Sequence, residues 1–327
     1  MFDVYKPSGS VGILTYPLVL IGVVFAILMA FIYHLCLSWI PFIYLNFLAS
    51  IGMGMGLGKI GSFAVTKGQC RNLLLAGVIG ILLATAGLGA KYWFQHQSVL
   101  HTATAMIRQD PTIPEADRQK AITEFQSAFT IGEYLRLRAN QGWQIGRGGR
   151  LPIAGIFVYL VWLIEAGFFY YCAVIGTWTA AGQPFSEKNH QWANESQVVM
   201  TLPVTDPAMV AKIQSATSVA DLLTIPIPQT DQSNRFAVYT VNSIPGQELE
   251  DAYLSVSNVT ISVNNKGEQE TNTTMLVKHA ILSSANRNQL IENAELLQEA
   301  LADFRSSKNA EEIEAESVDD VTDTGQS

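Results

Sequence analysis

One carboxylate lies inside the last long apolar stretch of the chain. Glu165 is the only charged residue between positions 151 and 180, and it lies close to the middle of that segment. An ionised carboxylate at the centre of a bilayer is costly unless it is paired, and insertion scales give about 2.5–3.5 kcal/mol. Three roles follow for Glu165: a structural polar contact, a proton- or ion-coupled function, or ligand binding.

Few groups in the other apolar segments could partner this carboxylate. The candidates in the first two segments are His34, Asn46 and Lys59. Tyrosine hydroxyl and tryptophan indole groups are further candidates. Because His34 and Lys59 lie towards the ends of their segments, sequence alone does not match their depth to that of Glu165.

Glycines recur at close intervals in the second apolar segment. They are Gly52, Gly54, Gly56, Gly58 and Gly61. At helical spacing such glycines remove side chains from one face and let another helix approach closely. Glycines at 77, 80, 87 and 89 make the third segment the expected partner. Packing within the chain, a glycine zipper between copies, and a pore are the three interpretations. Nucleotide binding is excluded because the glycines lie inside a span and do not join a strand to a helix.

Two arginines lie among glycines just before the fourth segment. Arg147 and Arg150 are flanked by Gly146, Gly148 and Gly149. Guanidinium groups and exposed backbone N–H groups can bind lipid phosphates. The alternative is that both arginines only anchor the fourth span at the headgroups.

No motif of a known enzyme class is present. The chain has no P-loop, no HExxH, no GxSxG and no CxxC, and its three cysteines are far apart. The five histidines lack the spacing of metal ligands, although His96 and His101 are five positions apart. We therefore expect no catalytic residues, no metal site and no cofactor.

Membrane-spanning helices must position these residues. Only 15% of the residues are charged, against about 25% in soluble domains. Residues 7–58 contain no Asp, Glu, Lys or Arg, which exceeds the roughly 20 apolar residues of one span. This excludes an ordinary soluble enzyme. The net charge of −8 makes nucleic acid an unsuitable partner, and the lipid bilayer is the expected one.

The sequence predicts an α-helical integral membrane protein with four transmembrane helices and a small soluble α+β C-terminal domain. Residues 1–12 form a cytoplasmic N-terminus. The first three transmembrane helices occupy 13–93, with spans at about 13–37, 42–66 and 73–93. Residues 94–150 form a polar loop with an amphipathic helix, and 151–180 form the fourth transmembrane helix. The soluble domain covers 183–308, and a disordered acidic tail with seven acids covers 309–327.

Local patterns predict elements in the two polar regions. Thr112 and Glu115 have capping-box spacing, and Ile122, Phe125, Phe129 and Leu135 follow at near-helical intervals. In the C-terminal region we expect a helix over 206–216, a strand over 236–241, a hairpin of 253–263 with 274–282, and a helix over 286–307.

The short turn between the second and third spans carries Lys67 and Arg71. Because short cytoplasmic loops are enriched in basic residues, this turn predicts an orientation with both termini in the cytoplasm. The basic residues of the 94–150 loop oppose that assignment.

Three stretches together resemble a family. Tyr5-Lys6-Pro7-Ser8-Gly9 opens the chain, Pro41–Phe47 begins the second span, and Pro184-Phe185 with Trp192 follows the fourth. This set resembles a group of uncharacterised bacterial multi-pass membrane proteins, which have Pro-Phe-Cys-x-x-Cys-x-x-Trp after the last span. Here Ser186 and Asn189 stand at the cysteine positions, so no thiolate site carries over. The resemblance implies a bacterial inner-membrane location.

These features favour a non-enzymatic bacterial inner-membrane protein whose soluble C-terminal domain binds a partner or senses a ligand. The alternative is a small transporter or channel that uses the glycine-rich second span and Glu165. A homo-oligomer or another membrane protein is the expected partner.

Overall fold

A computed structural model describes residues 3–39, 43–145, 151–204, 206–223, 225, 233–246, 252–296 and 299. The chain divides into two compact units. One unit covers Pro7–Gly182, and the other combines Met1–Lys6 with the residues from Gln183 onwards. The predicted tail over 309–327 lies outside the described residues.

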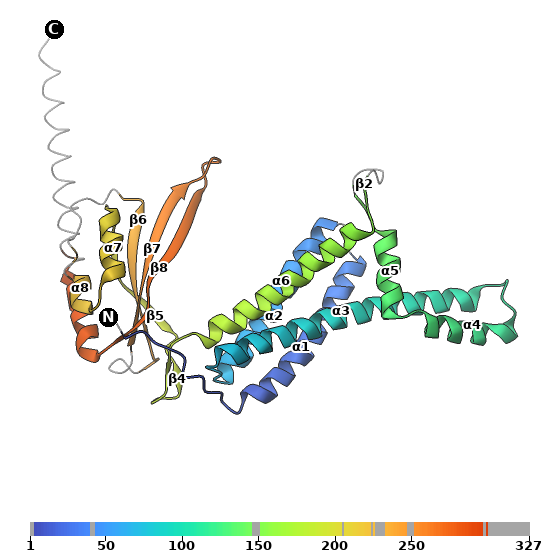
Figure 1. Ribbon diagram of the computed structural model, residues 1–327, viewed down its shortest axis with the longest axis horizontal. Helices are drawn as coiled ribbons and strands as arrows, with labels where there is room; N and C mark the ends of the chain where they lie inside the picture. The colour runs from blue at the N-terminus through green and yellow to red at the C-terminus, as the bar shows by residue number, and fades with distance from the viewer. Residues whose placement is uncertain are drawn as a thin grey trace, which may run out of the picture. The chain divides into compact units, whose positions relative to one another are not determined.

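Four helices of the first unit are long and apolar enough to cross a membrane, as predicted (Figure 1). They are α1 (Thr15–Trp39), α2 (Ile43–Lys67), α3 (Leu73–Gln109) and α6 (Ile156–Ala181). Large apolar side chains remain exposed on their outer surfaces, for example Leu20, Val24, Leu160 and Leu163. Small residues fill the interior, including Ala26, Ala30, Ala76, Ala84 and Ala173. An apolar exterior around a close-packed interior is what a lipid environment requires.

The third helix is longer than the sequence predicted. The expected span ended at residue 93, where Tyr92 and Trp93 suggested a membrane interface, but α3 continues to Gln109. No glycine or proline interrupts residues 94–109, and the helix ends at Asp110, directly before Pro111. Its other end is capped by Asn72, whose side chain accepts from the N–H of Leu75 at 3.0 Å.

The glycines of α2 bring this helix close to α6. The sequence had predicted α3 as the partner. A Cβ on Gly58 would lie 2.6 Å from the carbonyl oxygen of Cys172, and one on Gly176 would lie 2.7 Å from the carbonyl oxygen of Gly58. Gly54 and Gly61 face Phe168 and Thr177 of the same helix. Gly56 instead faces Met29 of α1, and Gly52 faces open space. The glycines therefore serve packing within the chain at four of the five positions.

The polar loop forms two helices where one was predicted. These are α4 (Glu115–Ala128) and α5 (Ile131–Gln141), and the chain breaks at Phe129 because Thr130 caps α5 through the N–H of Glu133. Thr112 does not cap α4, since its hydroxyl donates to Asp110. A short hairpin, β1 (Trp143–Ile145) with β2 (Leu151–Ile153), precedes α6. The fourth helix therefore begins later than the predicted residue 151, after Gly155 at φ 62°.

The second unit contains an antiparallel sheet in the order β5-β6-β7-β8 (Figure 1). Its strands are β5 (Glu195–Pro203), β6 (Arg235–Ser243), β7 (Ala252–Val263) and β8 (Gln269–Leu282). The predicted hairpin is confirmed as β7 and β8, and the predicted first helix as α7 (Pro207–Ser215), which Asp206 caps. The sequence did not predict β5, the short helix α8 (Val219–Leu223) or a small hairpin of β3 (Phe185–Ser186) with β4 (Gln191–Trp192). Residues 284–296 are helical.

The helices of this unit cover one face of the sheet. The core joins Met209, Ile213, Leu222 and Leu290 from the helices to strand residues such as Tyr239 and Leu254. This arrangement of helices on one side of an antiparallel sheet is the α+β class that the sequence predicted.

The first described residues of the chain belong to this sheet. Ile281 donates its N–H to the carbonyl of Asp3 at 2.8 Å, and Tyr5 donates to the carbonyl of His279 at 2.9 Å. The Tyr5 ring also packs edge-on against Tyr253, with centroids 5.5 Å apart. Residues 1–12 are thus not one separate segment as predicted, because residues 3–5 extend the edge of β8.

A methyl group at position 58 tests the contact between α2 and α6. Gly58→Ala should destabilise the helix bundle by about 1–3 kcal/mol, because the new Cβ meets backbone atoms of α6 that cannot move independently. Gly52→Ala is the matched control, since nothing lies within 4 Å of its Cβ position. Thermal unfolding of both variants in detergent measures the difference, and equal stability of the two would contradict the packing.

Candidate functional site

A buried polar cluster joins all four long helices. Lys91 of α3 forms an ion pair with the Oε2 atom of Glu165 on α6. The other carboxylate oxygen, Oε1, accepts from the hydroxyl of Tyr33 on α1 at 2.5 Å and from that of Ser50 on α2 at 3.0 Å. The two hydroxyls lie 2.8 Å apart. Each helix therefore contributes one polar side chain to a single network, which we call the polar cluster.

The positions of these residues along their helices explain why they meet. Tyr33 follows the first residue of α1 by 18 positions (33 minus 15), and Lys91 follows that of α3 by 18 (91 minus 73). Ser50 precedes the last residue of α2 by 17 positions (67 minus 50), and Glu165 precedes that of α6 by 16 (181 minus 165). At 1.5 Å per residue all four lie about 24–27 Å from the same end of the bundle. Alternating helix directions thus place them at one depth.

The surroundings of Lys91 reduce the cost of burying a cation. Its side chain is 3% exposed and that of Glu165 is 11% exposed. The ammonium nitrogen lies 4.8 Å from the ring centroid of Tyr92, 5.3 Å from that of Tyr33 and 5.9 Å from that of Phe169. Aromatic faces attract cations, and both carboxylate oxygens have partners, so the buried pair satisfies the conditions under which its desolvation is offset.

The partner of Glu165 is none of the three residues that the sequence suggested. His34 instead stacks on Phe94, with ring centroids 6.5 Å apart, and Lys59 is exposed on the surface of α2. The side chain of Asn46 lies outside the described part of the chain. Lys91 was missed because the next two aromatics indicated the end of the third span. A count of residues from each helix end would have matched Lys91 to Glu165.

The remaining predicted site residues do not join this cluster. Arg147 and Arg150 lie outside the described residues. The Nε2 atom of His96 lies 2.8 Å from the carbonyl oxygen of Phe129, so His96 joins α3 to the end of α4, whereas His101 is exposed. Among the described residues, no group of three His, Cys, Asp or Glu side chains could hold a metal ion.

The segment after α6 that carried the family resemblance forms the hairpin of β3 and β4. In this hairpin Ser186 Oγ accepts from the backbone N–H of Asn189 at 3.3 Å. Phe185 and Trp192 pack edge-to-face across the hairpin with centroids 5.0 Å apart. The hydrogen bond and the ring contact together stabilise this hairpin.

A histidine and a serine lie in contact on β7 and β8. The Nδ1 atom of His279 is 3.1 Å from Ser255 Oγ, and burial, followed by the nearby charge of Lys278, lowers the pKa of His279. Ser255 is buried and its hydroxyl also accepts from the backbone N–H of His279. These contacts lie at a strained backbone position, since His279 has a φ of 50°.

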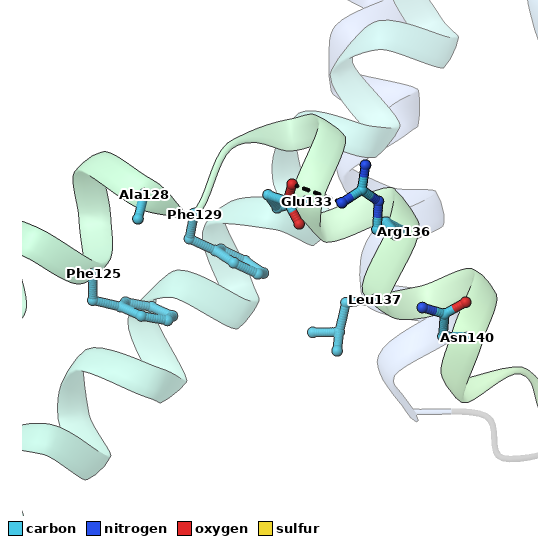
Figure 2. Close-up of a pocket in the computed structure, with 7 residues that line it drawn as sticks. All are labelled: Phe125, Ala128, Phe129, Glu133, Arg136, Leu137 and Asn140. Carbon is cyan, nitrogen blue, oxygen red and sulfur yellow. Dashed lines mark ion pairs between the residues drawn. The ribbon is translucent and has the colours of Figure 1, made fainter.

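A shallow hollow of about 460 Å³ lies between α4 and α5 (Figure 2). Its floor contains Phe125, Phe129 and Leu137, and the two phenylalanine rings stack at 5.2 Å. Glu133 and Arg136 form an exposed ion pair at its rim, with Nη1 and Oε1 3.4 Å apart.

The face of the sheet opposite the helices is not covered by a described helix. Strand register places side chains from all four strands there, because directly paired residues point to the same face. Val198 and Met275 on this face are 58% and 49% exposed. We define the outer face by Val198, Phe236, Val238, Val259 and Met275.

Comparison with known proteins gives no family from which a role could be transferred. No family model matches the chain, and neither the curated proteins nor the solved structures provide a match.

The polar cluster predicts a strong coupling between two substitutions. Lys91→Met should destabilise the bundle by about 3–5 kcal/mol, because it leaves Glu165 buried without its cation. The double variant Lys91→Met with Glu165→Leu should recover most of that loss. Unfolding in mixed detergent micelles measures the double-mutant cycle.

Lys59→Met is the control for loss of a cation, because Lys59 is exposed on α2, and it should change stability little. Additive effects of the two substitutions in the cycle would contradict a structural ion pair.

Proposed function

We propose that this chain is a non-enzymatic, multi-pass protein of the bacterial inner membrane whose C-terminal domain binds a protein partner. Four apolar helices with exposed apolar surfaces support the membrane location. The bacterial setting rests on the resemblance of the segments around residues 5–9, 41–47 and 184–192.

The pairing of residues 3–5 with 279–281 supports an even number of crossings. Both segments belong to one sheet, so they lie on the same side of the membrane. All four apolar helices lie between them in the sequence. Together with the basic residues Lys67 and Arg71, this favours both ends in the cytoplasm.

The outer face is the observation that carries the proposed partner binding. Antiparallel sheets that stand alone usually present polar side chains on the uncovered face. Here Val238 and Met275 lie in one row on either side of Ser257, Val198 lies in the next row beside Thr240, and Phe236 pairs directly with Val259. Large apolar side chains grouped on one uncovered face of a soluble domain are typical of a protein interaction site.

Site-specific photo-crosslinking in intact membranes tests this proposal. A photoreactive amino acid at Val198 or at Met275 should give a discrete crosslinked product, because both side chains are exposed on the outer face. The control position is Lys212, which is exposed on α7 away from that face. A product of twice the protomer mass would identify a second copy as the partner.

Equal labelling from Lys212, or no product from either outer-face position, would contradict partner binding at this surface.

A small transporter is the second candidate function, and the polar cluster favours it. Charged and hydroxyl side chains at one depth of a helix bundle are typical of proton relays. Transport predicts proton flux in liposomes that contain the purified protein. Glu165→Gln should abolish that flux. Tyr33→Phe keeps the carboxylate but removes one of its hydrogen-bond donors, so it should reduce the flux. Flux that persists unchanged in both variants would exclude this role.

A further inference from the structure

The hollow between α4 and α5 combines an apolar floor with two opposite charges. Phe125, Phe129 and Leu137 offer contact area, and Leu137 is partly exposed (Figure 2). The Glu133 and Arg136 side chains reach the rim from one helix turn of α5. An exposed ion pair of this kind contributes little to stability, so each of the two groups can release the other and bind a ligand instead.

Two contacts fix the level of α5 relative to the polar cluster. Near the beginning of α5, His96 contacts Phe129. His96 follows Lys91 by five residues in α3, which corresponds to about 7.5 Å along that helix. At the end of α5, the carbonyl of Ala139 accepts from the N–H of Gly155 at 2.7 Å. Gly155 precedes Glu165 by ten residues, which corresponds to about 15 Å of helix.

This level corresponds to lipid headgroups. The polar cluster lies about 24–27 Å from the opposite end of the bundle, and the hydrocarbon core of a bilayer is about 30 Å thick. A segment about 7–15 Å beyond the cluster therefore lies just outside the hydrocarbon core.

We propose that this hollow binds one phospholipid whose headgroup carries both a phosphate and a primary ammonium. Arg136 would bind the phosphate, and Glu133 would bind the ammonium. One acyl chain would lie along Phe125, Phe129 and Leu137. Charge complementarity selects this class, because a lipid with a phosphate alone leaves Glu133 opposed to an anion. The inference rests on the proposed membrane location.

Native mass spectrometry of the full-length protein in detergent, titrated separately with phosphatidylethanolamine and phosphatidylglycerol, tests this site. We expect one phosphatidylethanolamine to bind more tightly than phosphatidylglycerol. Arg136→Gln should weaken that binding by about tenfold, the factor expected for loss of one hydrogen bond to a charged group. Glu133→Gln should remove the preference between the two lipids.

The matched controls are Lys120→Gln and Glu124→Gln. These residues form another exposed ion pair on α4, 4.0 Å apart, outside the hollow. Equal affinity of the wild-type protein for the two lipids, or equal weakening by the control variants, would overturn the proposed lipid site.

Alkaline carbonate extraction separates this failure from failure of the membrane proposal. A protein that stays in the membrane but shows no lipid preference contradicts only the lipid site. A protein that carbonate releases contradicts the membrane location and the lipid site together.

Discussion

The ion pair between Lys91 and Glu165 constrains the whole helix bundle. A buried charge pair is stable only with good geometry and with all of its hydrogen-bonding groups satisfied. Glu165 needs Tyr33 and Ser50 for its second oxygen, and these come from the two remaining long helices. A shift of any helix by one turn would separate a donor from the carboxylate by about 5 Å. The network therefore fixes the relative height of four helices whose apolar surfaces alone would allow sliding.

Close contact between helix backbones stabilises the bundle in addition to the polar cluster. In lipid, apolar side chains gain little from turning inwards, so helices associate through dispersion contacts and hydrogen bonds. Gly58 and Gly176 let the backbones of α2 and α6 approach, and Gly80 brings α3 to the same helix near Ala173. The hydroxyl of Ser62 also donates to the carbonyl of Gly176 at 2.8 Å. α6 is thus both the helix with the carboxylate and the helix that its neighbours approach most closely.

Features carried by local pattern were predictable, and features carried by tertiary contact were not. The apolar runs indicated four long helices, and the turn Asn264–Gly267 indicated the hairpin of β7 and β8. Sequence also identified Glu165 and the glycines of α2. It could not identify the partners of Glu165 or of these glycines, because Lys91 and Gly176 meet them only where distant helices cross.

Two elements were missed or shortened for local reasons. The strand β5 lacked a regular alternation, since a bulge between Val198 and Met200 shifts its register. Helix α3 was shortened in the prediction because Tyr92 and Trp93 indicated a membrane interface, whereas the helix continues to Gln109.

The hydrogen bonds of Asp3 and Tyr5 to β8 affect the order in which the chain assembles. These contacts join residues separated by more than 270 positions, whereas each helical turn forms from neighbours. Contacts of such long separation form late, since the loop between them must first be closed. During synthesis the residues at positions 3–5 emerge long before their partners, and they must wait unpaired while all four helices are made. The edge of the sheet is completed only when β8 leaves the ribosome, so residues 3–5 are made before all four helices but fold after them.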